Sequence, residues 1–81
     1  MKPEEIIKQV NQIFITILDD EDIVLNEETT ANDVDDWDSL THIQLIVAIE
    51  KHFKIKFLAS EIQKWKNVGD LCNSIQTRLA Q

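Results

Sequence analysis

The residue types of a hydrolytic triad stand close together near the middle of the chain, as Asp38, Ser39 and His42. A triad needs a base that activates the serine, and an oxyanion hole that stabilises the developing charge. Residues three apart on one helix point along its surface, which suits this proton transfer poorly. The chain also has a single glycine, Gly69, and no Gly-x-Ser-x-Gly motif. We therefore expect no catalytic residue, and interpret His42 as a partly buried structural side chain.

A serine at the start of a helix can instead accept a modification. A phosphate attached there would face free backbone N–H groups and the positive end of the helix dipole. Asp38 is of the residue type that caps helices, so it would hold Ser39 outward in the first turn. Ser39 is therefore the candidate modification site.

Ser39 opens a predicted helix over residues 39–52 that carries two apolar faces. One has the spacing of a buried stripe, and consists of Leu45, Ile46, Ile49 and Phe53. The other consists of Leu40, Ile43 and Val47. A surface helix in a small domain needs only one apolar stripe, so the second stripe is either a docking surface or the cover of a neighbouring loop.

The remaining periodicity predicts an all-α fold with three longer helices and one short helix. The first helix begins near Pro3 and stops near Leu18. A long acidic connection follows over residues 19–37, with Ile23, Val24 and Leu25 as an apolar anchor and Val34 and Trp37 as further contacts with the core. Residues 54–58 form an extended link, and a short helix covers residues 60–66. The last helix is capped by Asn67, with Asp70 as its acidic partner, and runs to about Leu79.

Composition narrows the functional classes. The 81 residues form one domain, 1–81, and the single cysteine excludes a disulfide within the chain and a Cys/His zinc cage. The acidic loop does not fit an EF-hand, and we expect no metal site. The net charge is −7, and residues 9–50 contain eleven acids and no lysine or arginine. Such a surface repels nucleic acid and attracts basic protein surfaces.

No apolar window is long enough to span a bilayer, and no signal peptide precedes the first helix. We therefore expect a cytoplasmic, free-standing monomer that uses neither a membrane nor nucleic acid.

The sequence resembles the acyl carrier protein family over nearly its whole length. The resemblance rests on Asp38-Ser39-Leu40 at the start of an apolar helix, on Ala48-Ile49-Glu50 near its end, and on Lys66-Asn67-Val68-Gly69-Asp70-Leu71 before the last helix. In that family the serine carries 4'-phosphopantetheine, delivered from coenzyme A by a magnesium-dependent phosphopantetheinyl transferase, and the thiol of this arm carries acyl groups as thioesters. The resemblance implies that Ser39 is the attachment site and that Asp38 belongs to the transferase recognition motif. It also implies that Leu40, Ile43 and Val47 face acyl-transferring or condensing enzymes.

The sequence departs from the family pattern in its charges. Asp36-Trp37 replaces a Gly-x pair, and the helix after Ser39 has Thr41, Gln44 and Lys51 where many fatty-acid carriers have acids. We therefore expect partners to contact the loop acids Asp33, Asp35 and Asp36 as well. A specialised lipid, polyketide-like or aminoacyl cargo is as compatible with these residues as general fatty-acid synthesis. The other interpretation is a small acidic interaction module with no prosthetic group.

Overall fold

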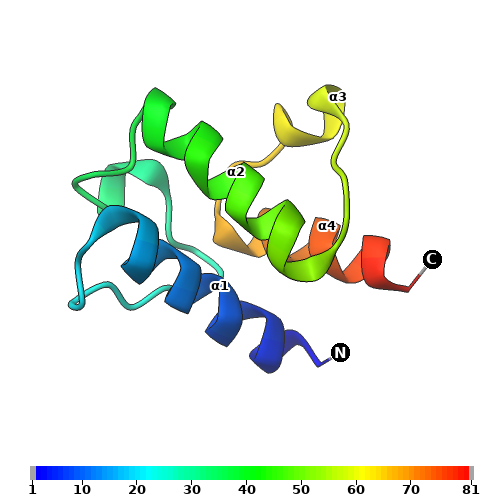
Figure 1. The fold of residues 1–81 in the computed structure, drawn as a ribbon, viewed down its shortest axis with the longest axis horizontal. Coiled ribbons are helices and arrows are strands. Elements are labelled where there is room, and N and C mark those ends of the chain that lie inside the picture. Colours follow the sequence, from blue (N-terminus) through cyan, green and yellow to red (C-terminus); the bar gives the residue numbers. More distant parts are fainter. Residues whose placement is uncertain (1, 81) are drawn as a thin grey trace.

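The computed structural model describes residues 2–80, so the terminal residues of the expected domain 1–81 lie outside it. It consists of α1 (Pro3–Leu18), a single 3-10 turn η1 (Ala31–Asp33), α2 (Ser39–Phe53), α3 (Ala59–Ile62) and α4 (Val68–Leu79). Figure 1 shows α1 and α2 side by side, and both α2 and α4 pack on α1. The all-α prediction is confirmed: within residues 2–80 there is no strand.

Helix α1 has the predicted bounds for the predicted reasons. Pro3 occupies the first turn, where a missing N–H costs nothing. Every fourth residue from Ile6 to Leu18 is buried, which places one stripe against the core. The helix stops because Asp19 adopts a left-handed conformation, with φ of 53°.

The connection between α1 and α2 is held against α1 by two hydrogen bonds. The side chain of Asn11 donates to the carbonyl of Ile23 and accepts from the N–H of Leu25, over 3.1 and 2.6 Å. Ile23 and Leu25 are buried, but Val24 between them is 84% exposed. The prediction that all three anchor the loop is therefore wrong for Val24, because successive residues of an extended segment point to opposite sides.

The same connection closes the start of α4. The N–H of Val68 donates to the carbonyl of Thr29, and the N–H of Gly69 donates to that of Glu27, both over 2.8 Å. These two donors have no partner within their own helix, so the loop satisfies them. Position 69 requires glycine, because a Cβ there would lie 2.8 Å from the carbonyl oxygen of Glu27.

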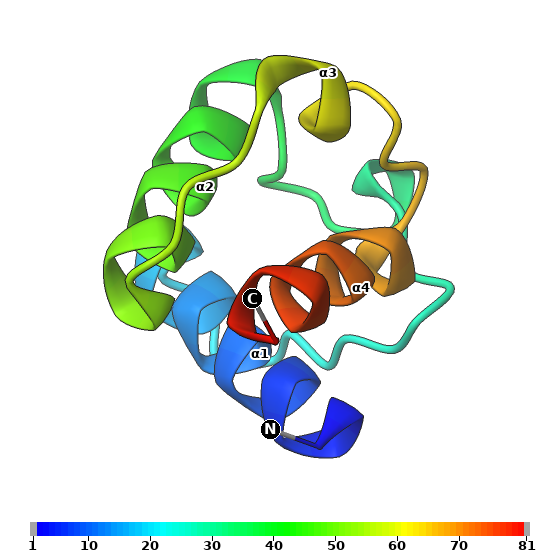
Figure 2. The same cartoon turned by 90° about the vertical axis from the view of Figure 1, so that its right-hand side faces the viewer.

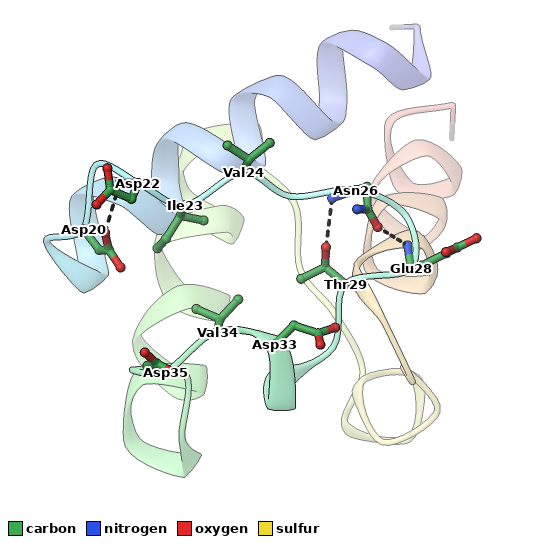
Figure 3. Close-up of a pocket in the computed structure, with 10 residues that line it drawn as sticks. All are labelled: Asp20, Asp22, Ile23, Val24, Asn26, Glu28, Thr29, Asp33, Val34 and Asp35. Atoms are coloured by element: carbon green, nitrogen blue, oxygen red, sulfur yellow. Dashed lines mark hydrogen bonds between the residues drawn. The ribbon is translucent and has the colours of Figure 1, made fainter.

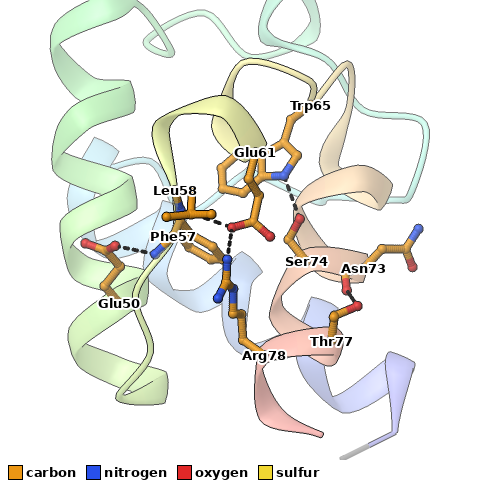
Figure 4. A network of polar contacts seen from close by, with 9 residues as sticks. All are labelled: Glu50, Phe57, Leu58, Glu61, Trp65, Asn73, Ser74, Thr77 and Arg78. Carbon is orange, nitrogen blue, oxygen red and sulfur yellow. Dashed lines mark hydrogen bonds and ion pairs between the residues drawn. The ribbon is translucent and has the colours of Figure 1, made fainter. Parts of the chain in front are cut away.

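The short helix begins at Ala59, within one residue of the predicted start, but it is only four residues long, so the predicted end near residue 66 is wrong. After Ile62 the chain tightens through i→i+3 bonds, in which Lys64 donates to Glu61 and Trp65 to Ile62. This turn carries the indole of Trp65 to α4, where its N–H donates to the Ser74 hydroxyl over 2.8 Å (Figure 4). Tertiary contacts of the indole thus end the helix before its apolar pattern does.

A polar network joins α3 and the preceding link to the rest of the molecule, as Figure 4 shows. Arg78 on α4 forms an ion pair with Glu61 on α3 over 2.8 Å, and Glu61 also accepts from the N–H of Leu58. Asn67 caps α4 as predicted, by accepting from the N–H of Asp70. The Asp70 carboxylate, however, accepts from the backbone N–H of Lys66 and not from that of Asn67. The expected capping box is therefore wrong in its second bond.

Candidate functional site at the start of helix α2

Asp38 caps α2, as the sequence predicted. Its Oδ1 accepts from the N–H groups of Leu40 and Thr41, each over 3.0 Å. The Thr41 hydroxyl in turn accepts from the N–H of Asp38 and donates to the carbonyl of Asp36 over 2.7 Å. The hydrogen bond from the Thr41 N–H is the main cause that lowers the pKa of the Asp38 carboxyl, so this carboxyl is charged at neutral pH.

Ser39 is the first residue of the helix, and its side chain is exposed. Among residues 2–80, no hydrogen bond involves its Oγ. The hydroxyl is thus open to an enzyme that would modify it. One expectation needs correction: the N–H groups of Leu40 and Thr41 are already bonded to Asp38, so an attached phosphate would meet the helix dipole but not these two donors.

Trp37 holds the segment before Ser39 against the core. Its ring meets that of Phe14 edge to face, with 4.9 Å between the centroids. Its indole N–H donates to Nδ1 of His42 over 2.9 Å. The expected core contact of Trp37 and the structural role of His42 are both confirmed. Because Nδ1 accepts from the indole, His42 is directed to Trp37. Within residues 2–80 no hydrogen bond joins it to Ser39, so it is not placed to act as a general base.

A recess of about 360 Å³ lies directly beside Ser39. Its walls come from the start of α2, from the turn before α4 and from α4 itself, and its lining residues are Ala31, Trp37, Asp38, Ser39, His42, Trp65, Lys66, Asn67 and Leu71. Two indoles and a leucine make much of this wall apolar, and Lys66 adds a cation. These residues fit a group joined to Ser39 through a phosphodiester, with an amide chain beyond it.

The second apolar stripe of α2 faces solvent. Leu40, Ile43 and Val47 are 68, 61 and 42% exposed, so they do not cover a neighbouring loop. Monomeric proteins rarely leave such a contiguous stripe uncovered unless another molecule binds it. Of the two interpretations left open by periodicity, the structure therefore supports the docking surface. Leu58, at 63% exposed, is a further apolar side chain that the sequence analysis placed in a link and missed.

The three loop acids differ in their surroundings. The Asp33 carboxylate accepts from the N–H of Thr30 over 2.9 Å and so closes η1. Asp35 and Asp36 are exposed, and no side-chain bond of theirs is found within residues 2–80. Asp33 therefore has a structural role, whereas Asp35 and Asp36 present their charge to solvent.

Asp33 and Asp35 also line an open depression along the loop, together with Asp20, Asp22 and Glu28 (Figure 3). Its backbone is organised by Asp20 and Asn26, which accept from nearby N–H groups. Among residues 2–80, no group of three or more histidine, cysteine or acidic side chains is placed to hold a metal ion. In the same range, no helix is both long and apolar enough to cross a membrane.

The comparisons with known proteins identify a family and a similar solved structure. The sequence profile described as the phosphopantetheine attachment site matches residues 8–75. The solution structure of a holo acyl carrier protein from Geobacter metallireducens is similar to this chain, with 51% sequence identity and a TM-score of 0.87. The match covers 91% of this chain and 85% of that one. No match is found among curated proteins.

Proposed function

This chain belongs to the phosphopantetheine-attachment family, and on that premise we propose that Ser39 is the residue that carries its arm. Membership makes the chain a carrier with covalently attached 4'-phosphopantetheine and not an enzyme. The thiol of the arm supplies the chemistry, by holding an acyl group as a thioester.

One observation carries the assignment to Ser39. Its hydroxyl is exposed at the first position of a 15-residue helix and makes no hydrogen bond within residues 2–80, and Asp38 fixes the backbone on either side of it. A transferase can therefore approach the hydroxyl without unfolding the helix. Ser39 Oγ would form a bond to the diphosphate phosphorus of coenzyme A that bears the pantetheine. The bond from that phosphorus to the bridging oxygen would break, adenosine 3',5'-bisphosphate would leave, and the hydroxyl proton would pass to a base of the transferase or to water.

The surroundings of Ser39 support recognition by basic partners. Asp35, Asp36 and Asp38 present carboxylates beside the hydroxyl, and Leu40 and Ile43 follow on the exposed side of α2. Opposite charges speed encounter, and apolar contact then stabilises the docked complex. We infer that the transferase and the acyl-transferring or condensing enzymes bind this face of a single carrier domain, with Asp33 contributing through its support of η1.

We propose that the cargo is an acyl group of fatty-acid, related lipid or polyketide biosynthesis. We further propose that the carrier is a monomer in the cytoplasm. This part of the proposal rests on the similarity to an acyl carrier protein.

Intact mass spectrometry tests the assignment. The protein is incubated with coenzyme A, Mg²⁺ and a broad-specificity phosphopantetheinyl transferase. The wild type and a Ser60→Ala control should each gain the mass of one arm, because Ser60 is an exposed serine that belongs to α3 and not to α2. The Ser39→Ala variant should gain nothing. An arm on Ser39→Ala, or none on the wild type, would refute the assignment.

A further inference from the structure

The exposed stripe of α2 does not end at Val47. Continuing at the same helical spacing, Leu40, Ile43 and Val47 are followed by Lys51 and by Lys54 at the end of the helix. Figure 2 shows α2 at the edge of the molecule, with its outer side turned away from α1 and α4. One line of side chains thus runs from apolar residues near Ser39 to two lysines at the far end.

The far end of this line is a depression with a basic rim. Its lining residues are Val47, Glu50, Lys51, Lys54, Ile55 and Lys56. All three lysines are exposed, and within residues 2–80 none of them is in an ion pair. The one acid of this lining is Glu50. Its carboxylate accepts from the N–H of Phe57 over 2.9 Å and so holds the link of residues 54–58 (Figure 4).

The near end of the same line has the opposite charge. Asp35, Asp36 and Asp38 are exposed around Ser39. Lys51 follows Ser39 by twelve positions of helix, a distance of about 18 Å along the axis. This spacing exceeds the Debye length of about 8 Å at physiological salt, so a docked partner meets two separate patches of charge.

We propose that this stripe is a docking surface with two charge poles, which selects a condensing enzyme whose rim is basic at the mouth of its arm tunnel and acidic about 18 Å away. Lys51, Lys54 and Lys56 are the specificity residues. They attract an acidic patch on the correct partner and repel a condensing enzyme with a wholly basic rim. This inference rests on the proposed function, because it concerns enzymes that receive cargo from an arm on Ser39.

A protein partner accounts for these lysines better than an anionic membrane does. The chain carries a net charge of −7, and the acids beside Ser39 lie on the same face, so a uniformly negative surface would repel half of the stripe. A protein rim can match both signs at once.

A charge exchange across the interface tests the proposal. The receiving protein is a condensing enzyme with a wholly basic rim, in its native form and in a form whose basic residues opposite the end of α2 are changed to glutamate. The carrier is first loaded with an arm and an acyl group, and mass spectrometry confirms the loading. The measured quantity is kcat/KM for transfer of the acyl group from the arm thiol to the active-site cysteine of the enzyme, which frees the arm thiol.

Three carriers are compared: the wild type, a Lys51→Glu/Lys54→Glu/Lys56→Glu variant, and a Lys2→Glu/Lys8→Glu/Lys64→Glu control with the same net charge. The lysines of the control are exposed and lie outside the stripe. With the native basic rim, the stripe variant should react about tenfold faster than the wild type at low salt. With the glutamate rim the order should reverse, and both differences should shrink at high salt. The order of kcat/KM between the control and the wild type should be the same with both rims.

Circular dichroism melting verifies that each carrier is folded. If the triple glutamate variant is unstable, the corresponding glutamine variant should show the same reversal, with a smaller difference in kcat/KM from the wild type. If the stripe variant and the wild type gave equal kcat/KM values with both rims, or if the control carrier showed the same reversal, this inference would be overturned. Attachment of the arm at Ser39 would be unaffected. Binding of the loaded wild type to anionic phospholipid vesicles, lost in the stripe variant, would assign the lysines to a membrane and also overturn it. Failure of loading would refute the proposed function, and this inference with it.

Discussion

The indole N–H of Trp37 donates to Nδ1 of His42 over 2.9 Å, and the two rings stack with 5.9 Å between their centroids. Nδ1 can accept this bond only in the neutral ring, with the ring proton on Nε2. Because Trp37 precedes Ser39 by two residues, the protonation of His42 bears on how firmly the modified segment is held.

The stability of the fold should fall as the pH drops below about 6.5. Burial lowers the pKa of His42 in the folded protein, so as the pH falls the unfolded chain takes up a proton first, which lowers the free energy of the unfolded state relative to the native state. The loss begins near the pKa of the unfolded histidine and levels off below that of the folded one. Thermal unfolding from pH 7.5 to 5 measures it. In a Trp65→Phe background, the fluorescence of Trp37 reports the local change.

The His42→Asn variant provides the comparison, since its amide oxygen can accept from Trp37 without titrating. Its melting temperature should depend less on pH than that of a His52→Asn control, in which the exposed histidine is replaced. If both variants respond to pH alike, the effect does not come from the Trp37–His42 bond.

Replacement of Gly69 by alanine should destabilise the protein by about 1–3 kcal/mol, although this change in a helix ordinarily stabilises by about 1 kcal/mol. The added Cβ would lie 2.8 Å from the backbone oxygen of Glu27, and the loop would have to move. Urea unfolding gives the stability, and hydrogen exchange at the Val68 and Gly69 amides reports whether their bonds to the loop are lost. The Asn73→Ala control changes an exposed position of the same helix. A Gly69→Ala protein as stable as the wild type would show that the loop yields freely.

Cys72 should remain unmodified under conditions that alkylate the arm. Burial, with a smaller contribution from Glu27, raises the pKa of its thiol to about 11, so at pH 8 only about one molecule in a thousand holds the reactive thiolate. Iodoacetamide at pH 8 should therefore label the arm-bearing form once and the unmodified form not at all. Mass spectrometry checks both, and unfolding in urea should expose Cys72 to the reagent. Rapid labelling of the folded, unmodified protein would contradict the burial of this side chain.

Neutralising Asp35 and Asp36 together should slow loading by the transferase about three- to tenfold at low salt, with the difference shrinking as salt is added. Both carboxylates face solvent beside the start of α2, so their loss removes attraction without removing a bond that holds the fold. The Asp35→Asn/Asp36→Asn variant is compared with Glu21→Gln/Asp22→Asn, which changes the same charge elsewhere on the loop. Asp33 is left intact because it closes η1. Identical loading rates in the two variants would place recognition elsewhere.

Local patterns in the sequence predict the three longer helices and single out Ser39 as the candidate attachment site. The bounds of α1, the Asp38 cap and the two stripes of α2 depend on neighbours three or four residues away, and such contacts repeat with the period of the helix. The same short range makes Ser39 recognisable from its neighbours Asp38 and Leu40.

Contacts between distant segments set which surfaces are covered and which face solvent. Periodicity left open whether Leu40, Ile43 and Val47 were covered, and their exposure depends on where the loop runs. That path is set by bonds between distant residues, from Asn11 to Leu25 and from Glu27 to Gly69. The early end of α3 has the same origin, since Trp65 turns away to reach Ser74. Such contacts join segments with no fixed spacing in the sequence, so no local pattern encodes them.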